Sequence, residues 1–316
     1  MSQPQLHGVR ELRIGLEQAG QRIDNFLLTQ LKGVPKSHVY RILRRGEVRV
    51  NGGRIRPEYR LQPDDRLRLP PMRTADRTPT TAPGATLQQR IADAILYEDN
   101  RYLILNKPSG VAVHGGSGVS FGVIETLRAL RPQAPFLELG HRLDRDTSGC
   151  LLLAKRRSAL RAFQELLRSG GVEKHYLALV RGAWQGGSRY IDLPLQRSIL
   201  RSGERMVHTS DSGKAARSRF VPLTYYRDAT LMRVTLITGR THQVRVHAAA
   251  SGHPLAGDEK YGDAAFNRLL RQSGLKRLFL HAEQLRFTPP EQATLALTAP
   301  LEASLQSLLQ QLEASL

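Results

Sequence analysis

Hydrophobic positions near the start of the chain follow a helical spacing and then an alternating one. The first group recurs every three or four residues, which predicts an amphipathic helix: Ile23, Phe26, Leu27 and Leu31. A second helix is predicted from Ser37, as its N-cap, to Gly46, which would end it. Its inward positions are Val39, Ile42 and Leu43. Alternating residues on either side of Asn51-Gly52 then predict a β-hairpin.

From about residue 91 onward, strand-like and helix-like patterns alternate. The predicted strands are residues 102–105, 151–154, 176–180 and 231–237. The predicted helices are residues 120–130 and 158–169, each capped by its first serine, with Gly170-Gly171 ending the second. A C-terminal helix is predicted from one leucine stripe, which we assign to core packing: Leu301, Leu305, Leu308, Leu309, Leu312 and Leu316. This order predicts an α+β domain around a mixed, mainly antiparallel sheet.

Composition shifts divide the chain into four predicted parts. They are an N-terminal tail over 1–18, a small domain over 19–71, a linker over 72–90 and a larger domain over 91–316. The linker prediction rests on a stretch rich in Thr, Pro, Ala and Arg without an apolar period. Such a linker would keep the larger domain at high effective concentration near any ligand of the small domain.

The overall charge points to a polyanionic partner. The 316 residues include 47 Lys and Arg against 28 Asp and Glu, a formal net charge of +19. Such an excess favours nucleic acid, because phosphate contacts release condensed counterions.

We find no run approaching the roughly 18 apolar residues of a membrane span and no secretory signal at the N-terminus. The single cysteine, Cys150, lies among apolar residues and is expected in the core. We therefore expect a cytoplasmic protein with no membrane partner.

The small predicted domain is unusually basic. Residues 21–70 carry 12 Lys and Arg against 5 Asp and Glu. Several cations would crowd the outer face and end of the second helix: Lys36, Arg41, Arg44 and Arg45. A solvated basic face is the simpler explanation. The order of helix, basic helix and hairpin nevertheless resembles the RNA-binding module of ribosomal protein S-four, the alpha-L motif, and implies that these four residues contact RNA.

Several kinds of active site are excluded by the absence of their motifs. The glycines at 115, 116 and 118 do not form a nucleotide-binding P-loop, because the lysine and the spacing are missing. Ser148 lacks the glycine-flanked elbow of a hydrolase nucleophile. His242 and His247 lack the metalloprotease spacing, and a lone cysteine excludes a zinc ribbon. We expect these histidines to be core or RNA-contacting residues.

Three polar clusters remain as candidates for chemistry. They are Leu-Asn-Lys-Pro-Ser-Gly at 105–110, His-Arg-Leu-Asp-Arg-Asp-Thr-Ser-Gly at 141–149 and Thr-Gly-Arg-Thr-His-Gln-Val-Arg-Val-His at 238–247. In the third, Thr241 is predicted to cap a helix that Gly252 closes, which would place Arg245 near the positive end of the helix. A carboxylate and an arginine from separate clusters usually form a structural salt bridge. In a cleft, the arginine would instead hold the carboxylate ionised as a nucleophile or base. The residues alone do not choose between Asp144 and Asp146.

These clusters, taken together, resemble the RluA family of pseudouridine synthases. The resemblance covers residues 91 to about 300 and includes Lys-His-Tyr at 174–176, Gly-His-Pro at 252–254, Gly-Asp at 257–258 and Tyr-Gly at 261–262, all in the family's order. The N-terminal module and the Val-His-Gly-Gly-Ser-Gly stretch at 113–118 add a likeness to a member that modifies several uridines of 23S ribosomal RNA. The stretch Arg217-Ser218-Arg219 is more basic than the family leads us to expect.

The resemblance implies a role for individual residues. It places the catalytic carboxylate at Asp144 rather than Asp146, its ion-pair partner at Arg245 and an active-site tyrosine that stacks on the base at Tyr176. Further residues implied to hold the nucleotide or its RNA are Arg142, His141, Thr147, Lys107 and Arg240. The implied reaction turns uridine into pseudouridine without a cofactor or a metal, in a nucleotide flipped out of structured RNA. The implied partner is 23S ribosomal RNA or an assembly intermediate, bound by a monomer.

Two other functions fit parts of the sequence. One is a non-catalytic RNA-binding or ribosome-assembly factor that keeps the same fold. An intact set of Asp144, Tyr176 and Arg245 argues against it, because binding alone does not require all three. The other is a metal-dependent nuclease that uses Asp144 and Asp146, which would require a divalent cation.

Overall fold

The computed structural model divides the chain into two compact units, Met1–Ala82 and Pro83–Leu316. The structure describes residues 6–15, 18–31, 34–73, 82–116, 119–199 and 205–314. Residues 74–81 of the predicted linker lie outside the described residues, and so do Ser117, Gly118 and Leu316. Among the helices of the described residues, none is long and apolar enough to cross a membrane.

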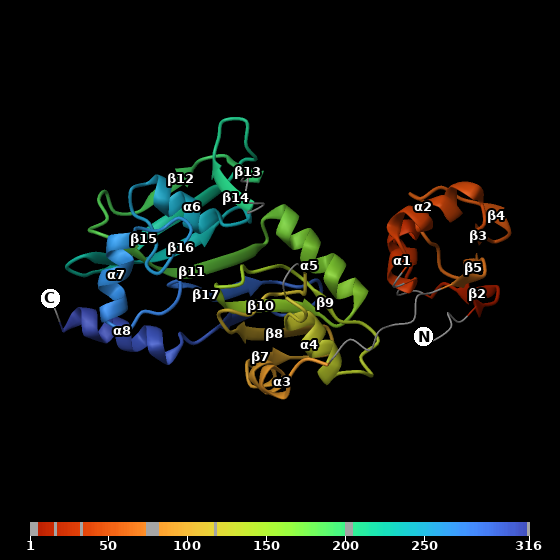
Figure 1. The fold of residues 1–316 in the computed structure, drawn as a ribbon, viewed down its shortest axis with the longest axis horizontal. Helices are drawn as coiled ribbons and strands as arrows, with labels where there is room; N and C mark the ends of the chain where they lie inside the picture. The colour runs from red at the N-terminus through yellow and green to blue at the C-terminus, as the bar shows by residue number, and fades with distance from the viewer. Residues whose placement is uncertain are drawn as a thin grey trace. The chain divides into compact units, whose positions relative to one another are not determined.

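The N-terminal unit packs two helices against a small sheet (Figure 1). Its elements are β1 (Leu6–His7), β2 (Arg10–Arg13), α1 (Ile23–Gln30), α2 (Lys36–Arg45), β3 (Arg49–Val50), β4 (Gly53–Arg54), β5 (Arg66–Leu69) and β6 (Met72–Arg73). The strands pair in the order β2-β5-β3-β4, with β1 and β6 forming a separate pair. The predicted apolar stripes of α1 and α2 meet in one core with Leu67 and Leu69 of β5. The positive φ angles of Asn51 and Gly52 form the predicted hairpin turn.

The C-terminal unit is an α+β fold around a large sheet, which confirms the predicted class. Its helices are α3 (Ala85–Ala92), α4 (Val123–Leu130), α5 (Arg157–Ser169), α6 (Gln243–Ala250), α7 (Ala264–Gln272) and α8 (Ala303–Glu313). Its strands are β7 (Ile95–Glu98), β8 (Tyr102–Lys107), β9 (Glu138–Leu139), β10 (Ser148–Ala154), β11 (Val172–Arg181), β12 (Arg189–Asp192), β13 (Leu195–Ile199), β14 (Arg205–Thr209), β15 (Arg217–Tyr225), β16 (Ala229–Leu236), β17 (Leu280–Phe287) and β18 (Leu295–Thr298).

Strands distant in sequence meet at the centre of this sheet. The order is β12-β15-β16-β11-β17-β10-β8-β7, with β18 beside β17 and β9 beside β10, while β13 and β14 form a separate hairpin. Strands β10 and β17 are parallel, and the other pairs of this sheet are antiparallel. Gly149 has a φ of +110°, and a Cβ there would collide with the backbone of Ala282 on β17. Only glycine therefore allows the two strands to approach directly after the Asp144 segment.

Helices pack against different strands of the sheet through separate apolar clusters. Ile91 of α3 and Leu127 of α4 pack against Leu103 and Leu105 of β8, at the end where Figure 1 draws these elements side by side. Helices α7 and α8 pack against β11 and β16 through a second cluster. The leucine stripe of α8 is core packing, as predicted, since Leu305 and Leu308 are buried. The predicted core position of Cys150 is also confirmed, and burial raises the pKa of its thiol to about 11.

The predicted helices are present, but all four predicted N-caps are wrong. Helices α2, α4, α5 and α6 have Pro35, Gly122, Arg156 and His242 as N-caps, in place of Ser37, Ser120, Ser158 and Thr241. In α4, the Glu125 carboxylate accepts a hydrogen bond from the Gly122 N–H, so a side chain of the first turn replaces the serine. Helix ends depend on such local partners, which a hydrophobic period does not encode.

Candidate active site

The Asp144 segment, residues 141–147, lies between β9 and β10 and borders two adjoining hollows. The larger, about 880 Å³, is lined by several cationic side chains: Arg90, Arg142, Arg145, Arg245, Lys260, Arg271, Lys276 and Arg277. The smaller, about 300 Å³, is lined by Tyr176 and by residues of the 238–245 segment. Asp144 and Arg245 line both. Among the described residues that line the smaller hollow, Asp144 supplies the single carboxylate.

The structure brings Asp144 and Arg245 together across the site. The Arg245 Nη1 and the His242 Nε2 each lie 3.9 Å from the Asp144 Oδ2. The Asp144 side chain is 19% exposed, whereas that of Arg245 is 9% exposed. A charge pair at this distance and burial is screened much less than one at the surface. Asp146, the rival carboxylate, is exposed and lines the larger hollow but not the smaller one.

Asp258 is the partner that binds Arg245 most closely. The Arg245 Nε donates to its Oδ2 and the Arg245 Nη2 to its Oδ1, both at 2.7 Å. Burial raises the pKa of Asp258, but the hydrogen bonds and charge of Arg245 outweigh burial and hold it below its ordinary value. The Arg245 guanidinium also lies 5.0 Å above the centre of the Tyr261 ring. Asp258 and Tyr261 belong to the 257–262 motifs, to which sequence reasoning assigned no role.

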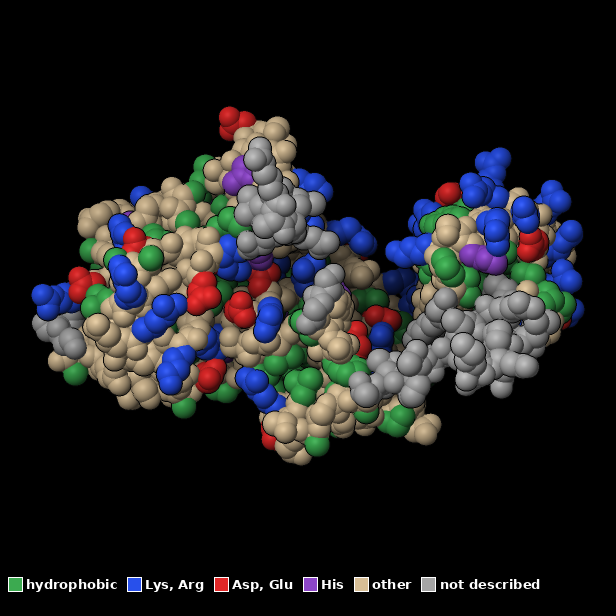
Figure 2. Space-filling view, viewed as in Figure 1, with side chains coloured by type: hydrophobic (Ala, Val, Ile, Leu, Met, Phe, Trp, Pro, Cys, Tyr) green, Lys and Arg blue, Asp and Glu red, His purple; other side chains and the backbone are tan. Residues whose placement is uncertain are grey.

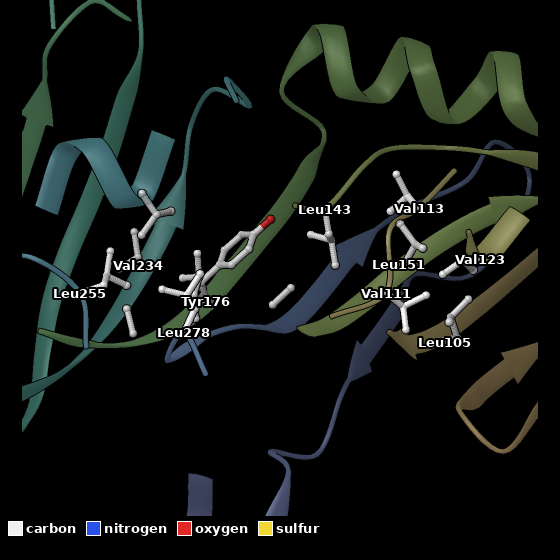
Figure 3. Packing of buried hydrophobic residues seen from close by; sticks show 14 of the residues in the cluster. Leu105, Val111, Val113, Val123, Leu143, Leu151, Tyr176, Val234, Leu255 and Leu278 are labelled. Atoms are coloured by element: carbon white, nitrogen blue, oxygen red, sulfur yellow. The ribbon is translucent and has the colours of Figure 1, made fainter. Parts of the chain in front are cut away.

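Tyr176 projects from β11 into the smaller hollow with 7% of its surface exposed. Figure 3 shows its ring extending towards Leu143, the residue before Asp144, among apolar side chains of the central core. Burial raises the pKa of the Tyr176 phenol, and the negative charge of Asp144 raises it further. The hydroxyl therefore keeps its proton at neutral pH.

Lys107 is enclosed, which contradicts the expectation that it contacts RNA. Its side chain is fully buried, and its Nζ donates to the carbonyl oxygens of Pro108, Val111 and Arg145 at 2.8–2.9 Å. Burial lowers its pKa to about 7. In its protonated form, Lys107 thus uses all three N–H donors inside the protein. Lys107 ties the end of β8 to the backbone one residue after Asp144.

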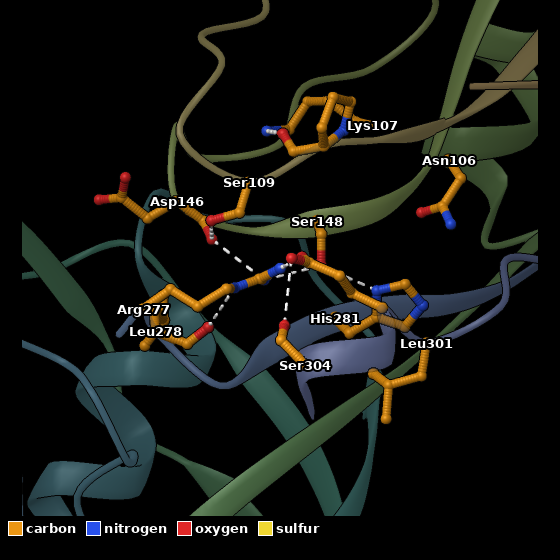
Figure 4. Close-up of polar contacts among 12 residues, drawn as sticks. Asn106, Lys107, Ser109, Asp146, Ser148, Arg277, Leu278, His281, Leu301 and Ser304 are labelled. Atoms are coloured by element: carbon orange, nitrogen blue, oxygen red, sulfur yellow. Dashed lines mark hydrogen bonds and ion pairs between the residues drawn. The ribbon is translucent and has the colours of Figure 1, made fainter. Parts of the chain in front are cut away.

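Arg277 supports the other end of the Asp144 segment (Figure 4). Its Nη2 donates to the Ser148 Oγ at 2.8 Å, and its Nη1 forms an ion pair with Glu302. The Ser148 hydroxyl lies 2.8 Å from the His281 Nδ1, and the His281 Nε2 donates to the Ala299 carbonyl at 3.0 Å. Ser148 is therefore buried in a structural network, in agreement with the absence of a nucleophile motif around it.

The remaining predicted contact residues fall into two groups. Arg142 and Arg240 are exposed at the smaller hollow, where their cations are accessible to a phosphate. His141 and Thr147 line the same hollow as neutral polar groups. Burial lowers the pKa of His141 to about 4, and its Nε2 accepts a hydrogen bond from the Leu152 N–H. Any contact of His141 with a nucleotide is therefore uncharged.

The four cations predicted on α2 are all exposed: Lys36, Arg41, Arg44 and Arg45. Figure 2 shows Lys and Arg side chains over much of the visible surface of the N-terminal unit. The apolar face of α2 is buried against α1, which leaves the cations on the solvent side. Among the described residues, no group of three or more His, Cys, Asp or Glu side chains has an arrangement that could hold a metal ion.

Family models agree with both units. The RNA pseudouridylate synthase model matches residues 101–250, and the S4 domain model matches residues 21–67. The first match contains Asp144, Tyr176 and Arg245, and the second contains α1, α2 and the hairpin. Together with the relatives described next, these matches show that the chain belongs to the RNA pseudouridine synthases, in the RluA family that its motifs resemble. It is thus an enzyme that isomerises uridine in RNA.

Curated relatives share nearly the whole length of the chain. The ribosomal large subunit pseudouridine synthase C of Escherichia coli (strain K12) is 56% identical over 96% of this chain and 97% of its own length. The protein of the same name in Haemophilus ducreyi is 55% identical over 97% of this chain and 96% of its own length.

Solved structures support the same fold. Human RNA pseudouridylate synthase domain containing 4 has a TM-score of 0.59 at 28% identity, covering 72% of this chain and 96% of its own. Human RNA pseudouridylate synthase domain containing 1 has a TM-score of 0.56 at 26% identity, covering 70% of this chain and 94% of its own.

Proposed function

We propose that this enzyme converts specific uridines of 23S ribosomal RNA to pseudouridine. Two observations support this substrate: the relatives named for the large ribosomal subunit align over nearly the whole chain, and an S4 domain precedes the catalytic unit. The formal net charge of +19 suits a polyanionic partner. The proposal includes assembly intermediates of the large subunit as substrates and a monomeric enzyme in the cytoplasm. Light scattering of the purified enzyme tests the monomer, and a stable dimer would contradict it.

The observation that carries the assignment of the catalytic residue is the position of Asp144. Its carboxylate stands where the two hollows meet, facing Arg245 and His242. The Arg245 guanidinium, 3.9 Å from the Asp144 Oδ2, places a positive charge beside the carboxylate that would act as a nucleophile or a base. Asp146, by contrast, is exposed and lines only the larger of the two hollows. We therefore assign the catalytic role to Asp144, with Arg245 as its positioning partner.

The reaction breaks the bond between the uracil N1 and the ribose C1′, rotates the uracil, and joins its C5 to the same C1′. The C5 proton then leaves and a proton returns to N1, so atoms balance without a cofactor. Attack on the base, attack on the sugar and removal of a sugar proton all use an ionised Asp144. Tyr176 would stack on the uracil and is the candidate for moving the C5 proton. Because burial keeps its phenol protonated, the hydroxyl would pass its own proton to another acceptor as it takes up the proton from C5.

The substrate uridine must leave its helix to reach this site. Flipping a nucleotide costs about a few kcal/mol, which phosphate contacts offset. We assign contacts with the flipped nucleotide to Arg142, Arg240, His141 and Thr147 around the smaller hollow. Contacts with distant RNA are assigned to the exposed cations of α2, namely Lys36, Arg41, Arg44 and Arg45.

A tritium-release assay on 23S ribosomal RNA labelled at the uridine C5 tests this function. We expect Asp144→Asn to abolish release while RNA binding persists, because the substitution removes the charge and keeps the shape. The matched control is Asp146→Asn, which should keep release near the wild-type rate. Full release by Asp144→Asn would refute the catalytic assignment. Wild-type enzyme that binds RNA without release would favour an assembly factor, and loss of activity in EDTA would favour a nuclease.

A further inference from the structure

His242 occupies a backbone conformation that histidine seldom adopts. Its φ of +55° and ψ of 18° lie in the left-handed region, and it is the N-cap residue of α6. A non-glycine residue in this region is strained and persists where its surroundings fix it, often at functional sites. The imidazole lies between the Tyr261 hydroxyl, on its Nδ1 side, and the Asp144 carboxylate, on its Nε2 side.

The hydrogen bonds of Tyr261 determine which nitrogen of His242 carries the proton. The Tyr261 Oη accepts a hydrogen bond from the Val207 N–H at 3.0 Å and lies 2.8 Å from the His242 Nδ1. The Val207 N–H can only donate, and the His242 Nδ1 is the one acceptor that the phenol proton has among the described residues, so we infer that the phenol donates to Nδ1. Nδ1 is then the acceptor, and a neutral imidazole must carry its hydrogen on Nε2.

The protonated nitrogen faces the catalytic carboxylate. The His242 Nε2 lies 3.9 Å from the Asp144 Oδ2, the same distance as the Arg245 Nη1 from that oxygen. Burial lowers the pKa of His242, and the cations of Arg245 and Lys260 oppose Asp144 and Asp258 in setting it. The His242 ring is therefore uncharged at neutral pH, with its Nε2–H on the side of the Asp144 carboxylate. At 3.9 Å, the His242 Nε2 is too far from the Asp144 Oδ2 for a hydrogen bond. This distance leaves the carboxylate space to move towards a substrate.

We propose that His242, held as the Nε2–H tautomer by Tyr261, is a positioning residue that orients the Asp144 carboxylate. This rests on the proposed catalytic role of Asp144. Tyr261 then acts on two donors at once, because its hydroxyl fixes the His242 tautomer and its ring lies under the Arg245 guanidinium. The β13–β14 hairpin contributes through Val207, which links a segment outside the main sheet to the active site.

The tautomer is tested without activity by ¹⁵N NMR of histidine-labelled full-length enzyme. The His242 signals are assigned as those that His242→Gly removes. We expect a protonated Nε2 and an unprotonated Nδ1 at neutral pH, and a mixed population of tautomers in Tyr261→Phe. A protonated Nδ1 in the wild-type enzyme, or a Tyr261→Phe variant with unchanged signals, would overturn the proposal. This outcome does not depend on the substrate, so it is distinguishable from failure of the proposed function.

The positioning role is tested by kinetics on the labelled RNA. Glycine relieves the strain at 242, so His242→Gly is expected to fold while kcat falls by about 10- to 100-fold with KM nearly constant. His242→Gln places an amide N–H near the Nε2 position and should recover part of the loss. The matched control is His208→Gln, on the exposed face of β14 beside Val207, with unchanged kcat. A His242→Gly variant with wild-type kcat, or glutamine and glycine variants with equal losses, would overturn the assignment.

Discussion

Replacing Asp258 with asparagine would remove one charge from the buried pair that supports Arg245. The Asp258 Oδ1 accepts from the Arg245 Nη2 at 2.7 Å and from the backbone N–H groups of Lys260 and Tyr261 at 2.9 and 3.0 Å. The Oδ2 accepts from the Arg245 Nε at 2.7 Å. Asparagine retains the Oδ1 interactions but places an NH₂ group opposite Nε. The variant therefore breaks one charge-assisted hydrogen bond, and the guanidinium loses its nearest counter-charge.

The expected loss in the free energy of unfolding is about 3 kcal/mol. Breaking a buried pair typically costs about 3–5 kcal/mol, because the remaining charge is left uncompensated. The lower end applies here, since Asp144 lies 3.9 Å from Arg245 and supplies a second negative charge. Arg245 would turn towards Asp144 and shorten that distance. We therefore also expect kcat to fall by about 100-fold, or about 2.7 kcal/mol in the activation barrier, through misplacement of the carboxylate.

Urea unfolding followed by tryptophan fluorescence measures the stability change. The chain has one tryptophan, Trp184, which is 1% exposed in the core of the catalytic unit and so reports on that unit. The matched control is Glu259→Gln, because Glu259 is 82% exposed and pairs with an exposed Arg271. It should cost less than about 1 kcal/mol. An Asp258→Asn variant no less stable than Glu259→Gln would refute the reasoning.

The same variant has a predicted pH dependence. The pKa of Asp258 lies below its ordinary value of 3.8 in the folded protein, so the unfolded chain binds its proton first as the pH falls. The stabilisation from this carboxylate is complete above its unfolded pKa and is lost as the pH falls through the folded pKa. We therefore expect the stability difference between wild type and Asp258→Asn to shrink below pH 3.8.

Three further predictions concern other parts of the enzyme. Lys107→Met should lower the free energy of unfolding by about 2–4 kcal/mol, because three buried carbonyls lose their donor. A fall in RNA affinity at unchanged stability would contradict this structural role. Tyr176→Phe should keep the RNA KM while kcat falls about 100-fold or more, and an unchanged kcat in the tritium assay would exclude the hydroxyl from proton transfer. Replacing Lys36, Arg41 and Arg44 by glutamine should reduce the salt dependence of RNA binding. The slope of log K against log salt concentration should fall by about 0.7–0.9 for each phosphate that is no longer neutralised. An unchanged slope would argue against these phosphate contacts.

The kinds of secondary structure in this protein were predictable, but several of their ends were not. Hydrophobic periods located α1, α2, α5 and the central strands, because the apolar residues of a buried face recur with the period of the helix or strand. The start of α4 depends on the Glu125 carboxylate bonding to Gly122, and the start of α6 on His242 in the left-handed region. Both depend on backbone geometry that no hydrophobic pattern reports.

The candidate site also combines residues that the sequence selected correctly with one that only the structure placed. The motif order and the resemblance it carries selected Asp144, Tyr176 and Arg245 as a set, and the structure gathers these three residues around one hollow. The family resemblance implied that Lys107 contacts the RNA. Instead its ammonium is buried against three carbonyls and supports the Asp144 segment. A single sequence does not reveal which lysine is enclosed, because enclosure depends on segments that fold over it.

By itself, the sequence determined the α+β class, the basic N-terminal module and the family, because periodicity, charge and motif order are local properties of the chain. Only the tertiary structure decided which side chains become hydrogen-bond partners. Asp258 lies 13 residues from Arg245, and Ser148 lies 133 residues from His281, yet each pair shares a hydrogen bond. The choice of Asp144 over Asp146, two residues apart, gained its geometric support in the same way. Only the folded chain shows that one of them faces Arg245 and His242 while the other is exposed to solvent.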